Sequence, residues 1–230
     1  MARAEQTQRL RQRLQEMRRF EETLQHAGVS LIAGVDEVGR GPLAGPVTAA
    51  AVILPPDCGI LGIDDSKKLS PRQRERLSEE IRRQAVCWSL GWCDSRRIDQ
   101  INILQATMEA MRLALQGLRV RPGHVLIDAL ALPGLEMPQT AIVHGDRLSV
   151  SIAAASILAK VARDARMQEY HRAYPGYAFD RNKGYGTRAH FEGLDRQGLC
   201  PIHRRSFLIH YLEGGTQWKS PGRTGPGTIN

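Results

Sequence analysis

Aromatic residues are scarce in this chain, at 5% of its 230 residues, and cysteine occurs only four times. No two of the cysteines (Cys58, Cys87, Cys93 and Cys200) have CxxC spacing, and no cluster of histidines completes a zinc site. We therefore expect neither a disulfide framework nor a structural zinc site. Free thiols in a reducing compartment are favoured instead.

Long apolar runs are also missing. No stretch of about 18 apolar residues occurs, so no membrane-spanning helix is expected. The N-terminal region lacks the apolar core of a signal peptide, and its glutamates (Glu5, Glu16, Glu21 and Glu22) argue against a transit peptide. We expect a cytoplasmic protein that does not act on a membrane.

Acidic residues are outnumbered by basic ones. The chain has 32 Lys and Arg against 24 Asp and Glu, which gives a net charge of +8. This balance favours a polyanionic partner, with nucleic acid first and an anionic membrane second. The hydrophobic fraction of 42% and the charged fraction of 24% are typical of globular proteins, and the length fits one domain with extensions.

Short apolar segments alternate with helical patterns along the chain. We expect strands at residues 31–36, 45–54, 85–93, 124–130 and 140–146, and helices at 5–26, 69–83, 94–117, from about 149 and after 187. The first two strands follow each other closely, as antiparallel neighbours do. The pattern predicts an α/β domain with a mixed central sheet.

The two ends of the chain differ in composition from its middle. Residues 1–28 carry an apolar stripe among arginines, which predicts a basic amphipathic helical extension. This helix either packs on the domain or contacts nucleic acid. Residues 214–230 are rich in Gly, Pro and Ser and predict a flexible tail, so the central domain should span residues 29–213.

Three of the expected strands run into acidic residues: Asp36 with Glu37, then Asp128, then Asp146. If these strand ends share one edge of the sheet, four carboxyl groups converge and repel one another unless a cation binds. Carboxylate oxygens select hard ions, so Mg²⁺ or Mn²⁺ is expected rather than zinc. An acid after a strand also serves as a helix cap or turn residue, and Asp146 is the most open to that interpretation.

Adjacent residues on a regular strand face opposite sides of the sheet. Asp36 and Glu37 can therefore serve one metal site only if the chain bends there, or if Glu37 also offers its backbone carbonyl. Gly39 and Gly41 follow directly and would make such a bend easy.

Basic and aromatic residues near the acids are candidate nucleic-acid contacts. Arg40 lies between two glycines, and Lys67 and Lys68 lie in a loop just before a helix, where they suit a phosphodiester. Tyr185 lies between two glycines in "KGYGT", a setting that favours stacking on a sugar or base. Solvated lysines and a surface turn tyrosine are the alternatives that spacing leaves open.

The segments "GVDEVGRGPLAGPVTAAAVIL", "DDSKKLS", "VLIDA", "GDRLSVSIAAASILAKVARD" and "YPGYAFDRNKGYGT" occur in this order over residues 31–190. Together they make the chain similar to ribonuclease HII, the type 2 ribonuclease H, although Val38 replaces the alanine of the family's D-E-A-G-R-G. The resemblance implies a ribonuclease H-like fold: a mixed central sheet flanked by helices, with a helical C-terminal part.

The resemblance also implies roles for particular residues. The family's metal-binding acids correspond to Asp36, Glu37, Asp128 and Asp146. Its ribose-sensing Gly-Arg-Gly corresponds to residues 39–41 (Gly39, Arg40 and Gly41), and its junction-stacking tyrosine corresponds to Tyr185. With two Mg²⁺ or Mn²⁺ ions, such an enzyme cleaves the RNA strand of RNA–DNA hybrids. It also cuts on the 5′ side of a single ribonucleotide in duplex DNA, leaving 3′-OH and 5′-phosphate ends. A monomer is expected.

Other functions remain open from the residues alone. A metal-free ribonuclease would use histidines as acid and base, but the seven histidines show no evident pairing and the acids would be unexplained. Another nuclease with an acid cluster, such as a transposase-like or junction-cutting enzyme, would differ in substrate. A non-catalytic RNA–DNA duplex-binding protein would keep Arg40, Lys67, Lys68 and Tyr185 but would not need four acids.

Overall fold

The computed structural model describes residues 2–214 of the chain. Its elements, in chain order, are α1 (Ala2–Met17), α2 (Arg19–His26), β1 (Ile32–Val38), β2 (Val47–Ile53), α3 (Pro71–Gln84), β3 (Cys87–Cys93), α4 (Ser95–Gln116), β4 (His124–Asp128), β5 (Gln139–Ile142), α5 (Gly145–Leu148), α6 (Val150–Ala173), α7 (Phe179–Asn182), α8 (Arg188–Gln197), the 3₁₀ helix η1 (Arg205–Phe207) and α9 (Ile209–Leu212). The expected tail lies outside the described residues, apart from Gly214. Among the described helices, none is long and apolar enough to cross a membrane.

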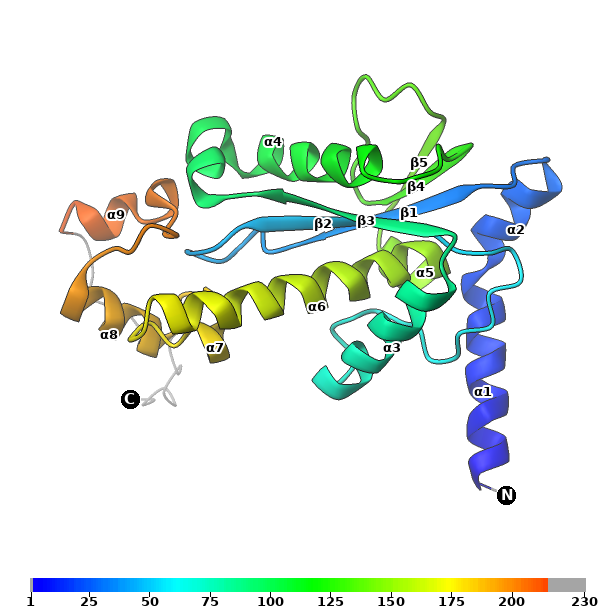
Figure 1. Cartoon of the computed structure of the whole chain (residues 1–230), viewed down its shortest axis with the longest axis horizontal. Coiled ribbons are helices and arrows are strands. Elements are labelled where there is room, and N and C mark those ends of the chain that lie inside the picture. The colour runs from blue at the N-terminus through cyan, green and yellow to red at the C-terminus, as the bar shows by residue number, and fades with distance from the viewer. Residues whose placement is uncertain (1, 215–230) are drawn as a thin grey trace, which may run out of the picture.

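The five strands form one mixed sheet in the order β3-β2-β1-β4-β5. The pairs β1–β2 and β2–β3 are antiparallel, whereas β1–β4 and β4–β5 are parallel. Helix α4 covers one face of the sheet, and α6 with α3 covers the other (Figure 1). The predicted α/β domain with a mixed central sheet is confirmed.

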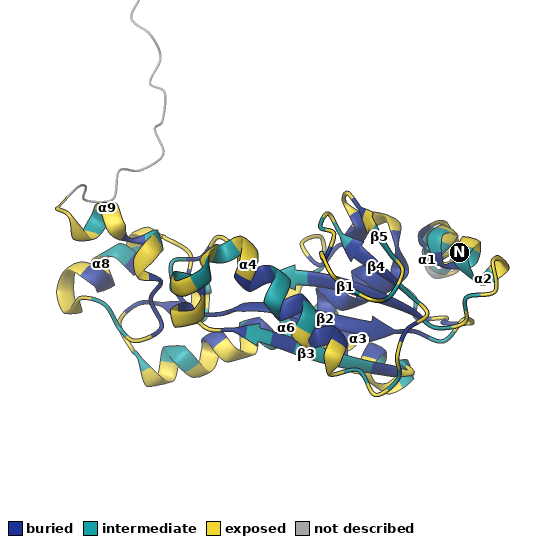
Figure 2. Ribbon diagram, turned by 90° about the horizontal axis from the view of Figure 1, so that it is seen from above, coloured by how far each residue is buried: buried dark blue, intermediate teal, exposed yellow. Residues whose placement is uncertain are grey.

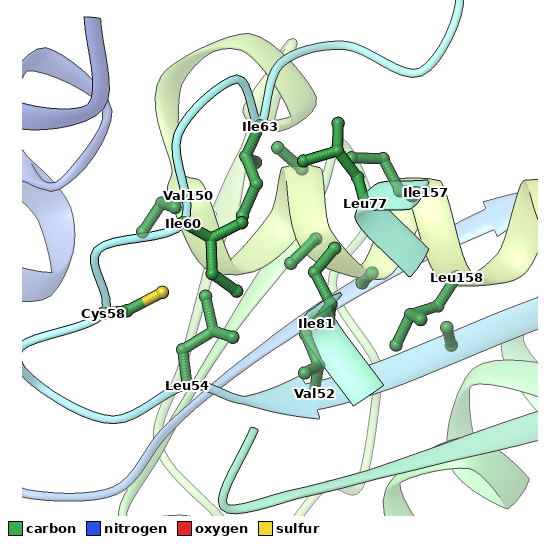
Figure 3. Packing of buried hydrophobic residues seen from close by; sticks show 14 of the residues in the cluster. Val52, Leu54, Cys58, Ile60, Ile63, Leu77, Ile81, Val150, Ile157 and Leu158 are labelled. Atoms are coloured by element: carbon green, nitrogen blue, oxygen red, sulfur yellow. The ribbon is translucent and has the colours of Figure 1, made fainter. Parts of the chain in front are cut away.

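Helix α6 lies very close to the sheet because small residues line the contact. A Cβ added to Gly34 in β1 would come within 2.0 Å of the backbone carbon of Ser151 in the first turn of α6. Alanines of α6 and β2 then pack with larger apolar side chains from the loop before α3 and from α3 itself, as Figure 3 shows around Ile60, Leu77 and Ile81. This contact fixes α6 along β1, the strand that carries two of the candidate acids.

Two of the expected helices are interrupted. The expected helix 5–26 is two helices, α1 and α2, separated at Arg18, whose N–H makes a tight-turn bond to the Gln15 carbonyl and whose guanidinium donates to the carbonyl of Pro56. Helix α4 breaks at Asn102 (φ 66, ψ 167), whose side chain accepts the N–H of Leu104 at 3.0 Å and so caps the second half. Each break provides hydrogen bonds that a continuous helix would lack.

The N-terminal helices pack on the domain. Met17 is fully buried, and so is most of Glu21, whose carboxylate accepts hydrogen bonds from the Ser149 hydroxyl at 2.5 Å and from the Ser151 N–H at 3.0 Å. An acid at this position favourably meets the N-terminal end of α6. The outer side of α1 is exposed (Figure 2), so the structure favours the interpretation of a packed helix with one solvated face.

Candidate active site

Asp36 and Glu37 both lie inside strand β1. They pair in regular register with Ala50 and Ala49 of β2, and the strand continues to Val38. The expectation that the strand ends at Asp36 was therefore wrong, and the regular pairing gives no bend at the two acids, which leaves the backbone carbonyl of Glu37 as the other condition for one shared metal site. Since the pairing with β2 is uninterrupted, their side chains start from opposite faces of the sheet.

The parallel pairing of β1 with β4 brings the next acid close. The register Val35↔Ile127 places Asp36 beside Asp128, the last residue of β4. The carboxylate of Asp128 accepts the N–H of Gly145 at 2.6 Å, which anchors the start of α5. Asp36, inside β1, and Asp128, at the end of β4, therefore lie side by side on neighbouring strands.

Asp146 does not end a strand, because β5 stops at Ile142 and Asp146 lies in the short helix α5. The expected strand 140–146 was wrong in this respect. The side chain is nevertheless buried, and the Lys67 ammonium lies 3.3 Å from its Oδ2. Lys67 thus joins the acids, whereas Lys68 lies 3.2 Å from Asp64 instead.

Burial and mutual repulsion govern the ionisation of the acids. Burial is the main reason why the pKa of Asp36 lies well above its ordinary value, and the charges of Glu37 and Asp128 add to it. Burial also raises the pKa of Glu37, against the opposing effect of the Arg40 guanidinium 3.6 Å away. The pKa of Asp128 is raised mainly by burial, with a further contribution from Asp146.

Each carboxylate is held by a partner of its own. Asp36 accepts the Glu37 N–H at 2.7 Å, and the nearby Ser156 hydroxyl on α6 acts to lower its pKa. In the described residues, no three His, Cys, Asp or Glu side chains are grouped closely enough to hold a metal ion as they stand. The donor set still fits a hard divalent cation, since it consists of carboxylate oxygens whose mutual repulsion such an ion would relieve.

The Gly-Arg-Gly loop and Tyr185 lie side by side. A Cβ added to Gly41 would lie 3.5 Å from Cε1 of Tyr185, and the Leu43 N–H donates to the Gly184 carbonyl at 2.8 Å. Gly39 has φ +93, and a Cβ there would meet the side chain of Arg163 at 2.2 Å, so only glycine fits. Tyr185 is 49% exposed, which leaves its ring accessible.

Several residues of the site region escaped the sequence analysis. The Ser156 hydroxyl lies near Asp36 and acts to lower its pKa. The side chains of the two buried arginines, Arg163 and Arg204, donate their hydrogen bonds to backbone carbonyls. A charged residue within the small-residue run of α6 is a signal that could have identified Arg163. Arg204 carries no such signal, because its neighbours along the chain are polar and basic.

Two histidines form a buried pair behind Tyr185. The Cys200 N–H donates to Nδ1 of His203 at 2.9 Å, so that nitrogen carries no proton. His203 must then donate through Nε2 to Nε2 of His190 at 3.0 Å, and His190 donates through Nδ1 to the Tyr185 carbonyl at 2.9 Å. Both rings are therefore neutral in the folded protein.

This pair predicts acid-sensitive stability. Burial, followed by the neighbouring His190, lowers the pKa of His203 to about 4, and burial also lowers the pKa of His190. Because these folded-state pKa values are depressed, the stabilisation is present above pH 6.5 and is lost as pH falls through the folded pKa. From pH 6.5 to 4 the loss for His203 should be on the order of 3 kcal/mol.

Urea unfolding across this pH range measures the effect. The variant His203→Asn should show a flatter dependence of its unfolding free energy on pH than the wild type. The matched control His210→Asn changes an exposed histidine and should keep the wild-type slope. Equal slopes for His203→Asn and the wild type would show that the pair does not control acid stability.

Comparison with solved structures defines the class of protein. The chain is similar to the crystal structure of the ribonuclease H2 from Pyrococcus horikoshii OT3, with a TM-score of 0.65 and 28% sequence identity over 76% of this chain and 93% of that one. The mixed sheet flanked by helices, with its helical C-terminal part, is thus a ribonuclease H-like fold.

The family follows from the sequence comparisons. The family model of ribonuclease HII matches residues 33–209. The ribonuclease HII of Moorella thermoacetica is 56% identical over 197 residues, which cover 86% of this chain and 96% of that protein. That of Enterococcus faecalis is 55% identical over 196 residues, covering 85% and 76%. The chain belongs to the ribonuclease HII family, a family of hydrolytic, metal-dependent ribonuclease H endonucleases, and the resemblance is confirmed.

Proposed function

We propose that this protein is a metal-dependent endoribonuclease that cleaves the RNA strand of RNA–DNA hybrids. It also cuts on the 5′ side of a single ribonucleotide in duplex DNA, leaving 3′-OH and 5′-phosphate ends. The observation that carries the proposal is the position of Gly41 beside the ring of Tyr185, in the loop that directly follows the strand with Asp36 and Glu37. Membership of the ribonuclease HII family supports the reaction class.

The four acids would hold the metal ions. Asp36, Glu37, Asp128 and Asp146 present only oxygen donors, and the pKa values of the first three are raised first by burial and further by neighbouring acids. Two bound Mg²⁺ or Mn²⁺ ions would supply activation of the attacking water and stabilisation of the departing 3′ oxygen. Lys67, 77% exposed at its side chain beside Asp146, is placed to contact a phosphate.

The Gly-Arg-Gly main chain would detect the 2′-hydroxyl. That hydroxyl is both donor and acceptor, so backbone groups can recognise it if they approach the sugar closely. Gly41 is exposed and has no side chain to prevent such an approach, and the carbonyls of Gly39 and Arg40 already accept hydrogen bonds from Arg204. Arg204 thus holds the Gly-Arg-Gly loop from the protein interior, while Gly41 remains exposed to the solvent.

A rival mechanism is disfavoured by the structure. A metal-free ribonuclease needs two histidines that reach the substrate as acid and base. His190 and His203 do lie 3.0 Å apart, but they are 0% and 4% exposed and bond to the protein interior. Their pairing serves the fold rather than proton transfer to a substrate.

Wild-type protein and an end-labelled DNA duplex with one ribonucleotide test the proposal. Cutting on the 5′ side of the ribonucleotide that requires Mg²⁺ or Mn²⁺, with ends that a polymerase can extend, is expected. Ends with a 2′,3′-cyclic phosphate would contradict the proposed chemistry. Tight binding of the duplex without any cleavage would favour the non-catalytic binding protein.

The role of Tyr185 gives a separate prediction. Tyr185→Ala should lower kcat/KM at an embedded ribonucleotide about tenfold, because stacking of an aromatic ring is worth about 1–3 kcal/mol. Tyr185→Phe keeps the ring and should retain most of the activity. The affinity for Mg²⁺, measured by calorimetry, should be unchanged in both variants. An equal loss of metal affinity and cleavage in Tyr185→Ala would argue against stacking.

A further inference from the structure

Arg204 is a fully buried arginine, with 0% of its surface exposed. Within residues 2–214 its guanidinium makes no ion pair with a carboxylate. It donates instead to three carbonyls of one loop, those of Gly39 at 2.6 Å, Arg40 at 2.8 Å and Gly45 at 3.0 Å. The side chain therefore holds the Gly-Arg-Gly main chain from the interior of the protein.

Arg163 on α6 reinforces the same loop. It is 1% exposed and donates to the carbonyls of Pro46 at 2.9 Å and Ala44 at 3.2 Å. A third bond, at 2.9 Å, reaches the carbonyl of Lys183, two residues before Tyr185. One guanidinium thus connects the loop of Gly39 with the loop that carries the tyrosine.

His203, the residue before Arg204, is connected to the other side of the site. Its ring donates to His190, and His190 donates to the carbonyl of Tyr185. The backbone around it is paired with the glycine loop as well, since the Arg204 N–H donates to the Leu43 carbonyl at 2.9 Å. Ala44 and His203 also form an isolated β-bridge.

We infer that the dipeptide His203–Arg204 is the positioning element that fixes the Gly-Arg-Gly main chain relative to Tyr185. It thereby sets the preference for the step from ribonucleotide to deoxynucleotide. The inference rests on the proposed function, because that step is what the two groups would recognise together. Both residues are buried, so each acts through other groups: Arg204 through three carbonyls, and His203 through His190.

The alternative is that Arg204 merely fills the core. Burying a guanidinium without a carboxylate partner costs free energy unless its N–H groups are hydrogen-bonded. If the side chain only had to fill space in the core, an apolar residue would do so at lower cost. All three bonds of Arg204 go to the loop expected to contact the ribose. A lysine cannot span the same carbonyls, because its ammonium is a point charge without the planar fork of donors.

The first test compares Arg204→Lys with Arg205→Lys, which changes the exposed neighbour. Steady-state kcat and KM are measured on a duplex with one embedded ribonucleotide and on a hybrid with an all-RNA strand. Arg204→Lys should lower kcat/KM at the embedded site about tenfold, the size expected for losing a hydrogen bond to a charged group. Its loss on the hybrid should be clearly smaller, and Arg205→Lys should keep the wild-type ratio of the two substrates. Equal losses on both substrates, or no loss, would overturn the inference.

The second test needs no cleavage and uses the full chain. In hydrogen–deuterium exchange, amides of residues 39–45 and 184–186 should exchange faster in Arg204→Lys, while those of β2 should be unchanged. Unchanged exchange in both loops would overturn the inference.

Nitrogen-15 NMR of the wild-type protein tests the inference without a variant, and so remains possible if Arg204→Lys does not fold. It should show His203 protonated at Nε2 and His190 at Nδ1, together with a coupling across the hydrogen bond from Arg204 to Gly39. The opposite tautomer in either ring, or no coupling to Gly39, would overturn the inference. If the wild-type protein cuts neither substrate, the proposed function is refuted. The exchange and NMR results would still show whether His203 and Arg204 position the Gly-Arg-Gly loop relative to Tyr185.

Discussion

Asp36→Asn is expected to reduce metal-dependent cleavage by more than about 100-fold, because changing even a residue that only orients a metal ligand costs 10–100-fold. Asp36 lies among the four acids, beside Asp128 in the sheet, and its carboxylate accepts the Glu37 N–H at 2.7 Å. The amide keeps the size and one acceptor oxygen of the carboxylate but removes its charge. Single-turnover cleavage of a duplex with one ribonucleotide, at saturating Mg²⁺, measures the loss.

The same substitution should leave the fold as stable as before or more stable. The pKa of Asp36 is raised in the folded state, first by burial and then by Glu37 and Asp128. A raised folded-state pKa means that the stabilisation is full at low pH and is lost as pH rises through that value. The neutral asparagine does not suffer this loss, so its advantage in melting temperature should grow from pH 4 to pH 7 in metal-free protein.

Asp195→Asn is the matched control. Asp195 is an exposed residue of α8 that accepts a hydrogen bond from the Tyr211 hydroxyl at 2.7 Å. The control should keep wild-type cleavage and should show no gain in stability as pH rises. Wild-type activity in Asp36→Asn, or a loss of activity that follows its unfolding, would remove Asp36 from the proposed metal site.

Gly34→Ala is expected to lower the free energy of unfolding by about 3 kcal/mol, at the upper end of the usual cost of overpacking. The added Cβ would come within 2.0 Å of the carbon and 2.2 Å of the oxygen of the Ser151 backbone, and within 2.5 Å of the Ile152 nitrogen. These are atoms of a helix turn, so relief requires α6 to move away from β1. Since α6 carries Ser156, the movement should also disturb Asp36.

Gly59→Ala provides the control for this prediction. Gly59 is exposed, and an added Cβ would have only the Asp57 carbonyl oxygen within reach, at 4.0 Å. Its effect should stay within about 0.5 kcal/mol, as for most surface substitutions. Urea denaturation of both variants measures the difference. A Gly34→Ala protein as stable as the control would mean that the helix does not pack so closely on the strand.

Local features of the fold were predictable from the sequence. Ser70 caps α3 with a complete capping box to Gln73, and Ser149 and Thr187 cap α6 and α8 at the positions where these helices were expected to begin. The strands were located correctly to within a few residues. In each case the deciding interaction joins residues close together in the chain, so a short stretch of sequence contains both partners.

The errors of prediction lie where a side chain overrides the local pattern. In a regular helix over residues 94–117, Leu104 would share the face of the buried Met111, seven residues later, yet Leu104 is 39% exposed, and the helix is broken at Asn102. Asp146 lies on a helical turn rather than at a strand end, and it reaches the acids because α5 packs against the end of β4. Neither outcome follows from hydrophobic spacing alone.

By itself the sequence determined the chemistry available: four acids, a glycine-flanked arginine, a glycine-flanked tyrosine and the order of motifs that marks the family. The tertiary structure alone decided how these parts are held together. The parallel register of β1 and β4 places Asp36 beside Asp128, and buried bonds from Arg204 and His203 connect the glycine loop with Tyr185. The physical reason is that a buried donor is stable only opposite its acceptor. Here the acceptors lie far from the donors in the sequence, in segments that meet only in the folded chain.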